Sequence, residues 1–243
     1  MEHAMAADEV GTPDSYLVAG CRPWNRDVYD REISKLPGSW SFAGSPAELE
    51  RLLHATAPPR YAFFLHWSWR VPPDIVERVE CVCFHMTDVP YGRGGSPLQH
   101  LILRGHRATK LSALRMTEEL DAGPVYLKAD LALDGSAEEI YLRATRLAAR
   151  MLERIIRERP IPTTQVGEPV VFARRRPEES RMPALADPRS IYDFVRMLDA
   201  EGYPLAFIEH QGLRLEFSKA RLEGDTVRAE VVIRTLAEGG PAS

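Results

Sequence analysis

Three short apolar runs constrain the fold of this chain more than any other feature. They read YLVAG at residues 16–20, YAFFL at 61–65 and CVCF at 81–84, and segments with a helical pattern separate them. Continuous apolar runs of this length are typical of strands buried on both faces. Strands that alternate with helices form mostly parallel sheets. We therefore predict an α/β fold built around a mostly parallel sheet.

Three helix starts share one pattern, in which a capping serine is followed three residues later by a glutamate or glutamine. The patterns are Ser45-Pro46-Ala47-Glu48, Ser96-Pro97-Leu98-Gln99 and Ser136-Ala137-Glu138-Glu139. The first two also place proline at the first helical position, and Gln99 is the expected capping partner in the second. The third opens the longest predicted helix, whose apolar stripe is Ile140, Ala144, Leu147, Met151, Leu152, Ile155 and Ile156.

The pattern changes after residue 159, where prolines and charges dominate up to Pro188. We interpret this stretch, with one short apolar segment at 170–173, as a linker that crosses the surface. A capped helix then begins at Asp187-Pro188, and strand-like pieces follow at 206–209, 213–217 and 227–234. The predicted organisation is a catalytic domain at 14–159, a linker at 160–187 and a small β-rich domain at 188–236.

Composition excludes several partner classes. The formal net charge is -4 and the isoelectric point is near 6.0, so no global attraction to nucleic acid or to anionic lipid is expected. No apolar run approaches the ~20 residues that span a bilayer. The N-terminus lacks the order of a secretory signal. We expect a cytoplasmic protein, and the sparse, odd set of Cys21, Cys81 and Cys83 fits a reducing compartment.

Cys81, Cys83 and His85 alternate along one predicted strand and raise the possibility of a zinc site. Alternate side chains leave a strand ~6.6 Å apart, given a rise of ~3.3 Å per residue. Two such ligands cannot converge on one zinc ion at ~2.0–2.3 Å. We therefore predict no metal.

The stretch CFHMTDVPYGRGGSPLQ at residues 83–99 carries most of the chemical information. A buried strand ends there in a glycine-rich loop, and ligands of α/β sheets bind at the carboxyl ends of strands. His85 lies at that end, and Arg93 offers a planar cation within the loop. Asp121 lies at a second strand-to-turn junction, before Ala122-Gly123. Taken singly, such a histidine is usually structural and such an aspartate usually forms a turn.

Together these residues resemble the formyltransferases that use 10-formyltetrahydrofolate, which include methionyl-tRNA formyltransferase and the nucleotide-sugar formyltransferases. The matching positions, in order and spacing, are His85, Thr87, Pro90, Arg93, Gly94, Ser96-Pro97 and Asp121-Ala122-Gly123. The resemblance runs from about Tyr16 to the C-terminal strands. It implies a shortened Rossmann-like domain followed by a small barrel-like domain. The chain departs from the family at Cys83, which stands where the family has a catalytic asparagine.

The resemblance also implies roles at the reaction centre. Formyl transfer to an amine requires stabilisation of an oxyanion and removal of a proton from the nitrogen. His85 would orient or protonate the oxyanion, and Asp121 would hold His85 and accept the amine proton. A thiol is a weak donor, so at Cys83 we expect a backbone N–H, a water molecule or a charged His85 to replace the asparagine.

Binding residues follow from the same resemblance. The pterin wall is expected at Leu65, Trp67, Trp69 and Val71, together with Asp121, although both tryptophans could instead be ordinary core aromatics. Substrate contacts are expected at Thr87, Arg93, Gly94, Gln99 and Arg175. The last lies in a run of three arginines that resembles a linker segment of the nucleotide-sugar enzymes, and such runs are more often solvated surface.

The acceptor is predicted to be a small amine. Residues 183–243 contain seven Arg and Lys against ten Asp and Glu, a balance of 7 - 10 = -3, which disfavours a nucleic acid. The resemblance implies that the acceptor is a nucleotide-linked amino sugar used for surface polysaccharides. The residues around His85 are most similar to those of the pseudaminic-acid-type members. The alternatives are a formyltetrahydrofolate hydrolase and a catalytically silent folate or nucleotide binder. Members of the family are usually homodimers, so we expect one here.

Overall fold

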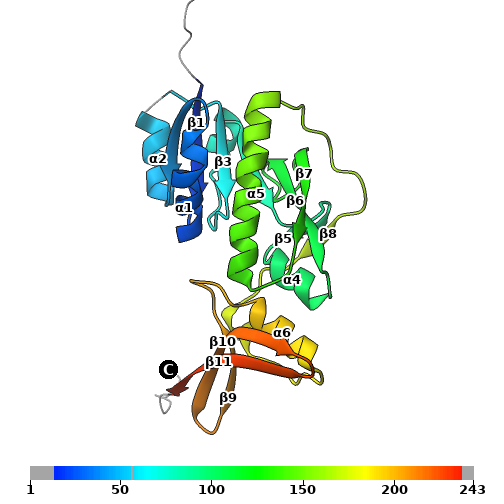
Figure 1. Cartoon of the computed structure of the whole chain (residues 1–243). Helices are drawn as coiled ribbons and strands as arrows, with labels where there is room; N and C mark the ends of the chain where they lie inside the picture. Colours follow the sequence, from blue (N-terminus) through cyan, green and yellow to red (C-terminus); the bar gives the residue numbers. More distant parts are fainter. Residues whose placement is uncertain (1–13, 56, 237–243) are drawn as a thin grey trace, which may run out of the picture. The chain divides into compact units, whose positions relative to one another are not determined.

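The computed structural model describes residues 14–55 and 57–236 (Figure 1). The chain divides into two compact units, and the division falls between Val82 and Cys83, inside strand β4.

The first unit is an α/β arrangement around parallel strands. Its elements are β1 (Ser15–Gly20), α1 (Pro23–Arg31), the 3-10 turn η1 (Ile33–Lys35), β2 (Ser39–Ala43), α2 (Pro46–Ala55), β3 (Tyr61–Leu65) and α3 (Pro73–Arg78). The strand order is β2-β1-β3, and β1 runs parallel to both neighbours. The predicted strands at 16–20 and 61–65 are confirmed. β2 was not predicted, because its sequence SWSFA contains no apolar run; only its last residue is buried.

Local contacts explain how this unit turns from strand to helix. A Cβ atom on Gly20 would lie 2.7 Å from the Cβ of Asn25, so glycine lets α1 pack against the end of β1. At α2, the hydroxyl of Ser45 accepts a bond from the Glu48 N–H at 3.3 Å, and the Glu48 carboxylate accepts one from Gly44 N–H at 2.7 Å. The predicted helix start at Ser45 is therefore confirmed, with the glutamate bonded one residue earlier than expected.

The second unit begins with the strand that leads to the site. Its first elements are β4 (Cys81–His85), β5 (Tyr91–Gly94), α4 (Pro97–Leu103), β6 (Ala108–Arg115), β7 (Val125–Ala132) and α5 (Ala137–Glu158). The strand order is β4-β6-β7, with β6 and β7 antiparallel. Helix α5 contacts β6 and β7 (Figure 1). Its predicted capping box is confirmed, since Ser136 and Glu139 bond each other's backbone N–H groups.

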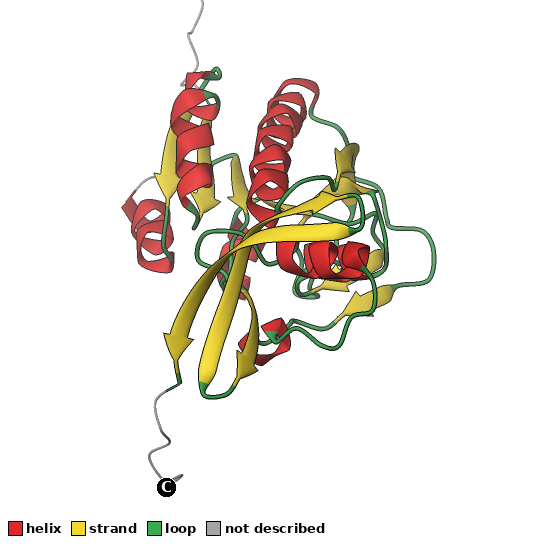
Figure 2. Cartoon of the chain, turned by 60° about the horizontal axis from the view of Figure 1, so that its bottom comes forward, coloured by secondary structure: helices red, strands yellow, loops and turns green. Residues whose placement is uncertain are grey.

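The C-terminal part of the second unit is a helix beside an antiparallel sheet (Figure 2). Its elements are β8 (Val170–Phe172), the 3-10 turn η2 (Pro177–Ser180), α6 (Pro188–Arg196), β9 (Ala206–His210), β10 (Leu213–Glu223) and β11 (Thr226–Thr235). The sheet order is β11-β10-β9. The β-rich part is confirmed. In the described residues its sheet does not close into a barrel, and the segment before α6 bridges the outer side of β9, where the Met182 N–H donates to the Phe207 carbonyl at 2.7 Å.

A buried arginine attaches this sheet region to the rest of the second unit. Arg196, at the end of α6, donates to the carbonyls of Leu133 at 2.6 Å and Gly135 at 2.9 Å, and its Nε lies 2.5 Å from Asp193. Three of the five guanidinium N–H groups thus have acceptors, which offsets the cost of burying the charge. The mostly parallel sheet and the C-terminal antiparallel sheet confirm the predicted α/β class. None of the described helices is both long and apolar enough to cross a membrane.

Candidate active site

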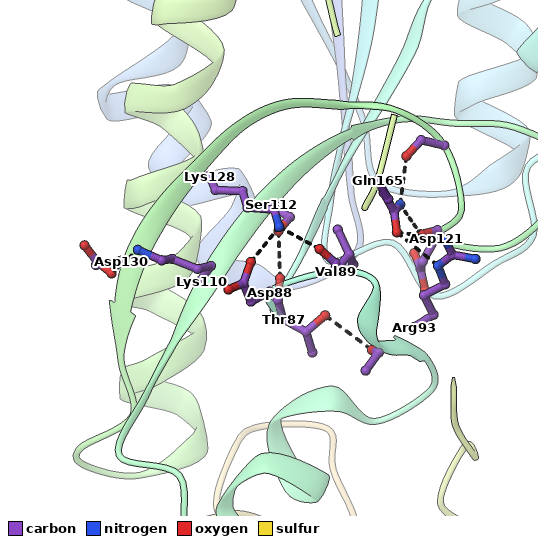
Figure 3. A network of polar contacts seen from close by, with 12 residues as sticks. Thr87, Asp88, Val89, Arg93, Lys110, Ser112, Asp121, Lys128, Asp130 and Gln165 are labelled. Atoms are coloured by element: carbon purple, nitrogen blue, oxygen red, sulfur yellow. Dashed lines mark hydrogen bonds and ion pairs between the residues drawn. The ribbon is translucent and has the colours of Figure 1, made fainter. Parts of the chain in front are cut away.

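The loop between β4 and α4 is anchored by buried polar contacts. The Thr87 hydroxyl donates to the Gly92 carbonyl at 3.3 Å, and the Ser112 hydroxyl of β6 donates to the Thr87 carbonyl at 2.7 Å (Figure 3). Lys128 of β7 adds bonds to the Asp88 carboxylate at 2.5 Å and to the Val89 carbonyl at 2.6 Å. The Val89–Pro90 peptide bond is cis. Two antiparallel strands therefore hold the loop that follows His85.

His85 is buried, and both of its ring nitrogens face acceptors. Nε2 lies 2.7 Å from the carbonyl oxygen of Gly92, and Nδ1 lies 3.4 Å from Oδ2 of Asp121. A carbonyl can only accept, so Nε2 carries the hydrogen in this contact. Nδ1 then faces a carboxylate, and the contact becomes a charge-assisted hydrogen bond only when Nδ1 carries a second proton. A hydrogen on Nδ1 would therefore point at Oδ2 of Asp121.

Asp121 is held in an unusual backbone conformation. Its φ is +54°, in the left-handed region that aspartate tolerates better than most residues. The Gly94 N–H donates to its Oδ2 at 2.9 Å. None of the described residues bonds to its other carboxylate oxygen, Oδ1. Gly123 is required two residues later, because a Cβ there would lie 1.8 Å from the Arg115 carbonyl oxygen. The pattern Asp121-Ala122-Gly123 thus reflects both chemistry and packing.

Gln165, from the predicted linker, supports this turn. Its amide donates to the carbonyls of Asp121 and Gly123, each at 2.8 Å. Its carbonyl accepts from Nε of Arg93 at 3.0 Å and from Nη2 at 2.9 Å (Figure 3). Arg93 also lies 3.4 Å from Glu119. Gln165 was not predicted from the sequence, because a single glutamine in a polar, proline-rich stretch carries no signal of its own.

The same stretch forms a strand against the glycine-rich loop. β8 pairs parallel with β5, and the Gly95 N–H donates to the Phe172 carbonyl at 3.0 Å. A Cβ on Gly94 would lie 2.5 Å from that carbonyl oxygen, and Gly94 has φ +99°. These glycines therefore let β8 approach the loop. The backbone N–H of Arg175 follows with a bond to the Ser96 hydroxyl at 3.0 Å, and burial lowers the pKa of the Arg175 guanidinium.

The predicted capping box at Ser96 is wrong. Ser96 adopts φ +50°, and its hydroxyl makes no cap bond because it accepts from Arg175 instead. The Gln99 amide is buried and donates to the Tyr141 hydroxyl at 3.1 Å and to the Met197 carbonyl at 2.9 Å. Thr87 is buried as well. Both side chains serve the fold in this structure, and substrate contact by either stays a prediction.

The segment predicted to face a pterin lies in the first unit, after β3. Leu65 and Val71 are buried, whereas the Trp69 side chain is 46% exposed and packs edge-on against Trp67, with ring centroids 4.9 Å apart. The indole N–H of Trp67 is buried and has no hydrogen-bond partner among the described residues. A buried donor without an acceptor costs about 1–3 kcal/mol. A bound group with acceptors beside an apolar ring would fit this segment.

The three cysteines form no disulfide, and Cys83 is half-buried. Burial raises the pKa of the Cys81 thiol to about 12, and the nearby Glu80 charge adds to the effect. In the part of the chain that the structure describes, no three His, Cys, Asp or Glu side chains gather as metal ligands would.

Comparison with known proteins finds formyltransferases among both the sequence relatives and the solved structures. A family model for the C-terminal domain of methionyl-tRNA formyltransferase matches residues 177–234. A structure described as methionyl-tRNA formyltransferase from Clostridium thermocellum is 40% identical, with a TM-score of 0.84. The match covers 91% of this chain and 99% of that one. A 4-N formyltransferase from Francisella tularensis shares the fold at 13% identity and a TM-score of 0.64, over 83% of this chain and 94% of that one.

A methionyl-tRNA formyltransferase from Wolinella succinogenes is 30% identical over 132 residues. The match covers 52% of this chain and 43% of that protein, so the chain spans less than half of this relative.

Proposed function

The chain belongs to the formyltransferase family of enzymes, and from that premise we propose that it transfers a formyl group from 10-formyltetrahydrofolate to the amine of a small acceptor. The buried His85–Asp121 contact beside the glycine-rich loop is the observation that carries this proposal. Bound folate would supply a formyl carbon that is ready for attack by an amine.

Asp121 is proposed to accept the amine proton. Its Oδ2 is fixed by the Gly94 N–H and by His85, whereas Oδ1 is left for a substrate or water. A positioned general base of this kind typically contributes 10²–10⁴-fold to a rate. His85 then passes the proton on, because its Nδ1 can exchange a proton with Oδ2 of Asp121 while its Nε2 keeps donating to the Gly92 carbonyl.

The formyl oxygen gains negative charge as the amine attacks, and it needs a hydrogen-bond donor. His85 can donate there only by releasing the Gly92 carbonyl, since that carbonyl occupies Nε2. Cys83 shares the face of β4 on which His85 lies, but its thiol is a weak donor. We propose that a backbone N–H or a water molecule takes the place of the family asparagine.

Leu65, Trp67, Trp69 and Val71 are proposed to hold the pterin. The support is the buried, unsatisfied Trp67 N–H next to an exposed tryptophan ring. A ring system with hydrogen-bond acceptors would satisfy that donor and cover Trp69.

A nucleotide-linked amino sugar is the proposed acceptor. Six of the seven Arg and Lys side chains between residues 183 and 243 are in ion pairs with neighbouring carboxylates. The pairs are Arg189 and Arg196 with Asp193, Arg214 with Glu209 and Glu216, Lys219 with Glu230, Arg228 with Glu223, and Arg234 with Glu216. A protein that binds the phosphates of a nucleic acid needs Lys or Arg side chains whose charge is not already neutralised by a carboxylate. Arg175, beside the loop, is the proposed contact for the acceptor phosphates.

Methionyl-tRNA is the second candidate acceptor, and the 40% identity to the Clostridium thermocellum protein favours it. Three exposed or half-buried arginines at 174–176 could meet its phosphates. This candidate predicts a binding affinity that falls steeply with salt, as phosphate contacts require.

One experiment separates these possibilities. The protein is incubated with 10-formyltetrahydrofolate and, in parallel, with a panel of nucleotide-linked amino sugars, with methionyl-tRNA, or with no amine, and products are identified by mass. Formylation of a sugar supports the proposal, and formylation of the tRNA alone replaces the acceptor. Formate release without an amine would identify a hydrolase, and folate binding without turnover would identify a silent binder.

A further inference from the structure

A pocket of about 340 Å³ opens between the C-terminal end of α4 and α6, two helices that contact each other in the second unit (Figure 1). Its lining comes from the last turn of α4, the turn that follows, Leu185 and one face of α6. The lining includes neither His85 nor Asp121. Small-molecule sites usually have volumes of about 300–1,000 Å³, so the pocket is large enough for a small ligand.

Part of the pocket is apolar. Ile102 and Phe194 line it and are buried, whereas Leu103 lines it and is 47% exposed. A Cβ atom on Gly105, in the turn after α4, would meet no atom within 4 Å, so open space borders this turn. An apolar group in the pocket would cover Leu103 and remove its side chain from water, which is favourable.

Two arginines line the same pocket, and both have N–H groups that no described residue uses. Arg107 is exposed, and no ion pair or hydrogen bond joins its guanidinium to another described residue. The Nε of Arg189 donates to Oδ2 of Asp193 at 2.8 Å, whereas its two terminal nitrogens have no acceptor among the described residues. Both guanidinium groups can therefore donate to a ligand.

Asp193 is the one carboxylate among the lining residues, and its charge is already compensated. Its Oδ2 accepts from Arg189, and its Oδ1 accepts from the Nε of Arg196 at 2.5 Å. Arg107 and Arg189 therefore leave the lining with a net positive charge. Such a lining attracts an anion and repels a cation.

We propose that this pocket binds a small organic anion, namely a carboxylate or a phosphate monoester on an apolar body. The apolar body would lie against Ile102, Leu103 and Phe194, and the anionic head would accept hydrogen bonds from Arg107 and Arg189. The planar fork of a guanidinium matches both kinds of head group, and charge-assisted bonds of this type are the strong ones. A neutral ligand of the same shape would make only the apolar contacts.

Amide chemical-shift mapping of the nitrogen-15-labelled full chain tests the proposal. The probes are octanoate, octyl phosphate, octanol and octylammonium, each kept below the concentration at which it forms micelles. We expect both anions to shift the amides of residues 102–107 and 189–194 in a saturable way. They should bind at least tenfold more tightly than octanol or octylammonium. The tighter of the two anions identifies the head group that the pocket prefers.

Substitutions show whether the guanidinium of Arg107 holds the head group. Arg107→Glu should weaken the binding of both anions at least tenfold, and Arg107→Lys, which keeps the charge, should weaken it less. Arg150→Glu is the matched control, because Arg150 is an exposed arginine on α5 that does not line the pocket. It should leave both affinities within twofold of the wild type. Unchanged far-ultraviolet circular dichroism shows that each variant is folded.

Several outcomes would overturn the proposal. Neither anion shifting these amides at concentrations up to ~10 mM would mean that the pocket binds no such ligand. Octanol binding as tightly as the anions would mean that the arginines contribute nothing. Shifts centred on Trp67 and Trp69 would place the anions in the first unit. An equal loss of affinity in Arg107→Glu and Arg150→Glu would point to the overall charge of the molecule instead of this pocket.

Discussion

Replacing Gln165 with alanine tests whether the linker sets the geometry of the reaction centre. The substitution removes two hydrogen bonds to the carbonyls of Asp121 and Gly123. Each half-buried bond contributes about 0.5–1.5 kcal/mol, so the turn loses about 1–3 kcal/mol of support. The left-handed backbone of Asp121 costs a comparable ~1–3 kcal/mol. We therefore expect the ordered turn to lose most of its stability advantage.

The expected result is a fall in kcat of about ten- to hundredfold, since ~1.36 kcal/mol corresponds to tenfold in rate. KM for the folate should change little, because the segment of the first unit that we propose to hold the pterin is untouched. Gln165→Glu separates the two halves of the side chain: it keeps an oxygen for Arg93 but loses the donor to Asp121. It should match the alanine variant in kcat. Val166→Ala, at a side chain 89% exposed, is the control.

Steady-state kinetics with the acceptor found active, together with hydrogen exchange of the amides at 122–123, provide the readout. Faster exchange in Gln165→Ala with kcat within twofold of wild type would show that catalysis does not need this turn. Wild-type activity in Gln165→Glu would show that the Arg93 contact matters and the bonds to the Asp121 turn do not.

Four further predictions follow from single positions. Asp121→Asn should lower kcat by about 10²–10⁴-fold with an unchanged melting temperature, and a loss below tenfold would remove it as the base. Cys83→Ala should keep turnover within tenfold, whereas a thousandfold loss would make the thiol catalytic. Gly123→Ala should lower the free energy of unfolding by about 3 kcal/mol in urea titrations, the upper end for overpacking; an unchanged midpoint contradicts the close contact. Burial lowers the pKa of His66 to about 3. Between about pH 3 and 6.5 the unfolded chain therefore binds more protons at this residue than the folded chain does. The free energy of unfolding should fall as pH drops below about 6.5. His66→Asn, which tolerates the local φ of +52°, should flatten that dependence, and an equal slope in both proteins would refute it.

The elements that the sequence predicted are those whose signal is local. The apolar strands β1 and β3 are buried on both faces, β4 is buried except for the half-buried Cys83 and Phe84, and α5 carries both a capping box and an apolar stripe. Strand β5 had no such signal, because YGRG forms a strand only through its pairing with β8. The same holds for the cap of α4, where Ser96 bonds to a residue far along the chain.

In the site, too, residues with a local sequence signal could be predicted and residues that depend on distant partners could not. His85 and Asp121 could be identified because their residue types and spacing match a family, and the structure brings them together. Their catalytic roles, and the folate and substrate contacts, stay predictions, as do the domain boundaries at 14–159, 160–187 and 188–236. Gln165 could not be found, since its importance arises from three partners that are distant in sequence.

The path of the segment between α5 and α6 has a consequence for engineering this fold. Thr163 exchanges backbone bonds with Val125, β8 pairs with β5, and the Arg175 N–H bonds to Ser96. A chimera that borrows another enzyme's C-terminal sheet should therefore join the two parents after residue 176. A junction near residue 160 would import a foreign strand into the catalytic loop, and a protease cut there would loosen the reaction centre as well as the C-terminal sheet.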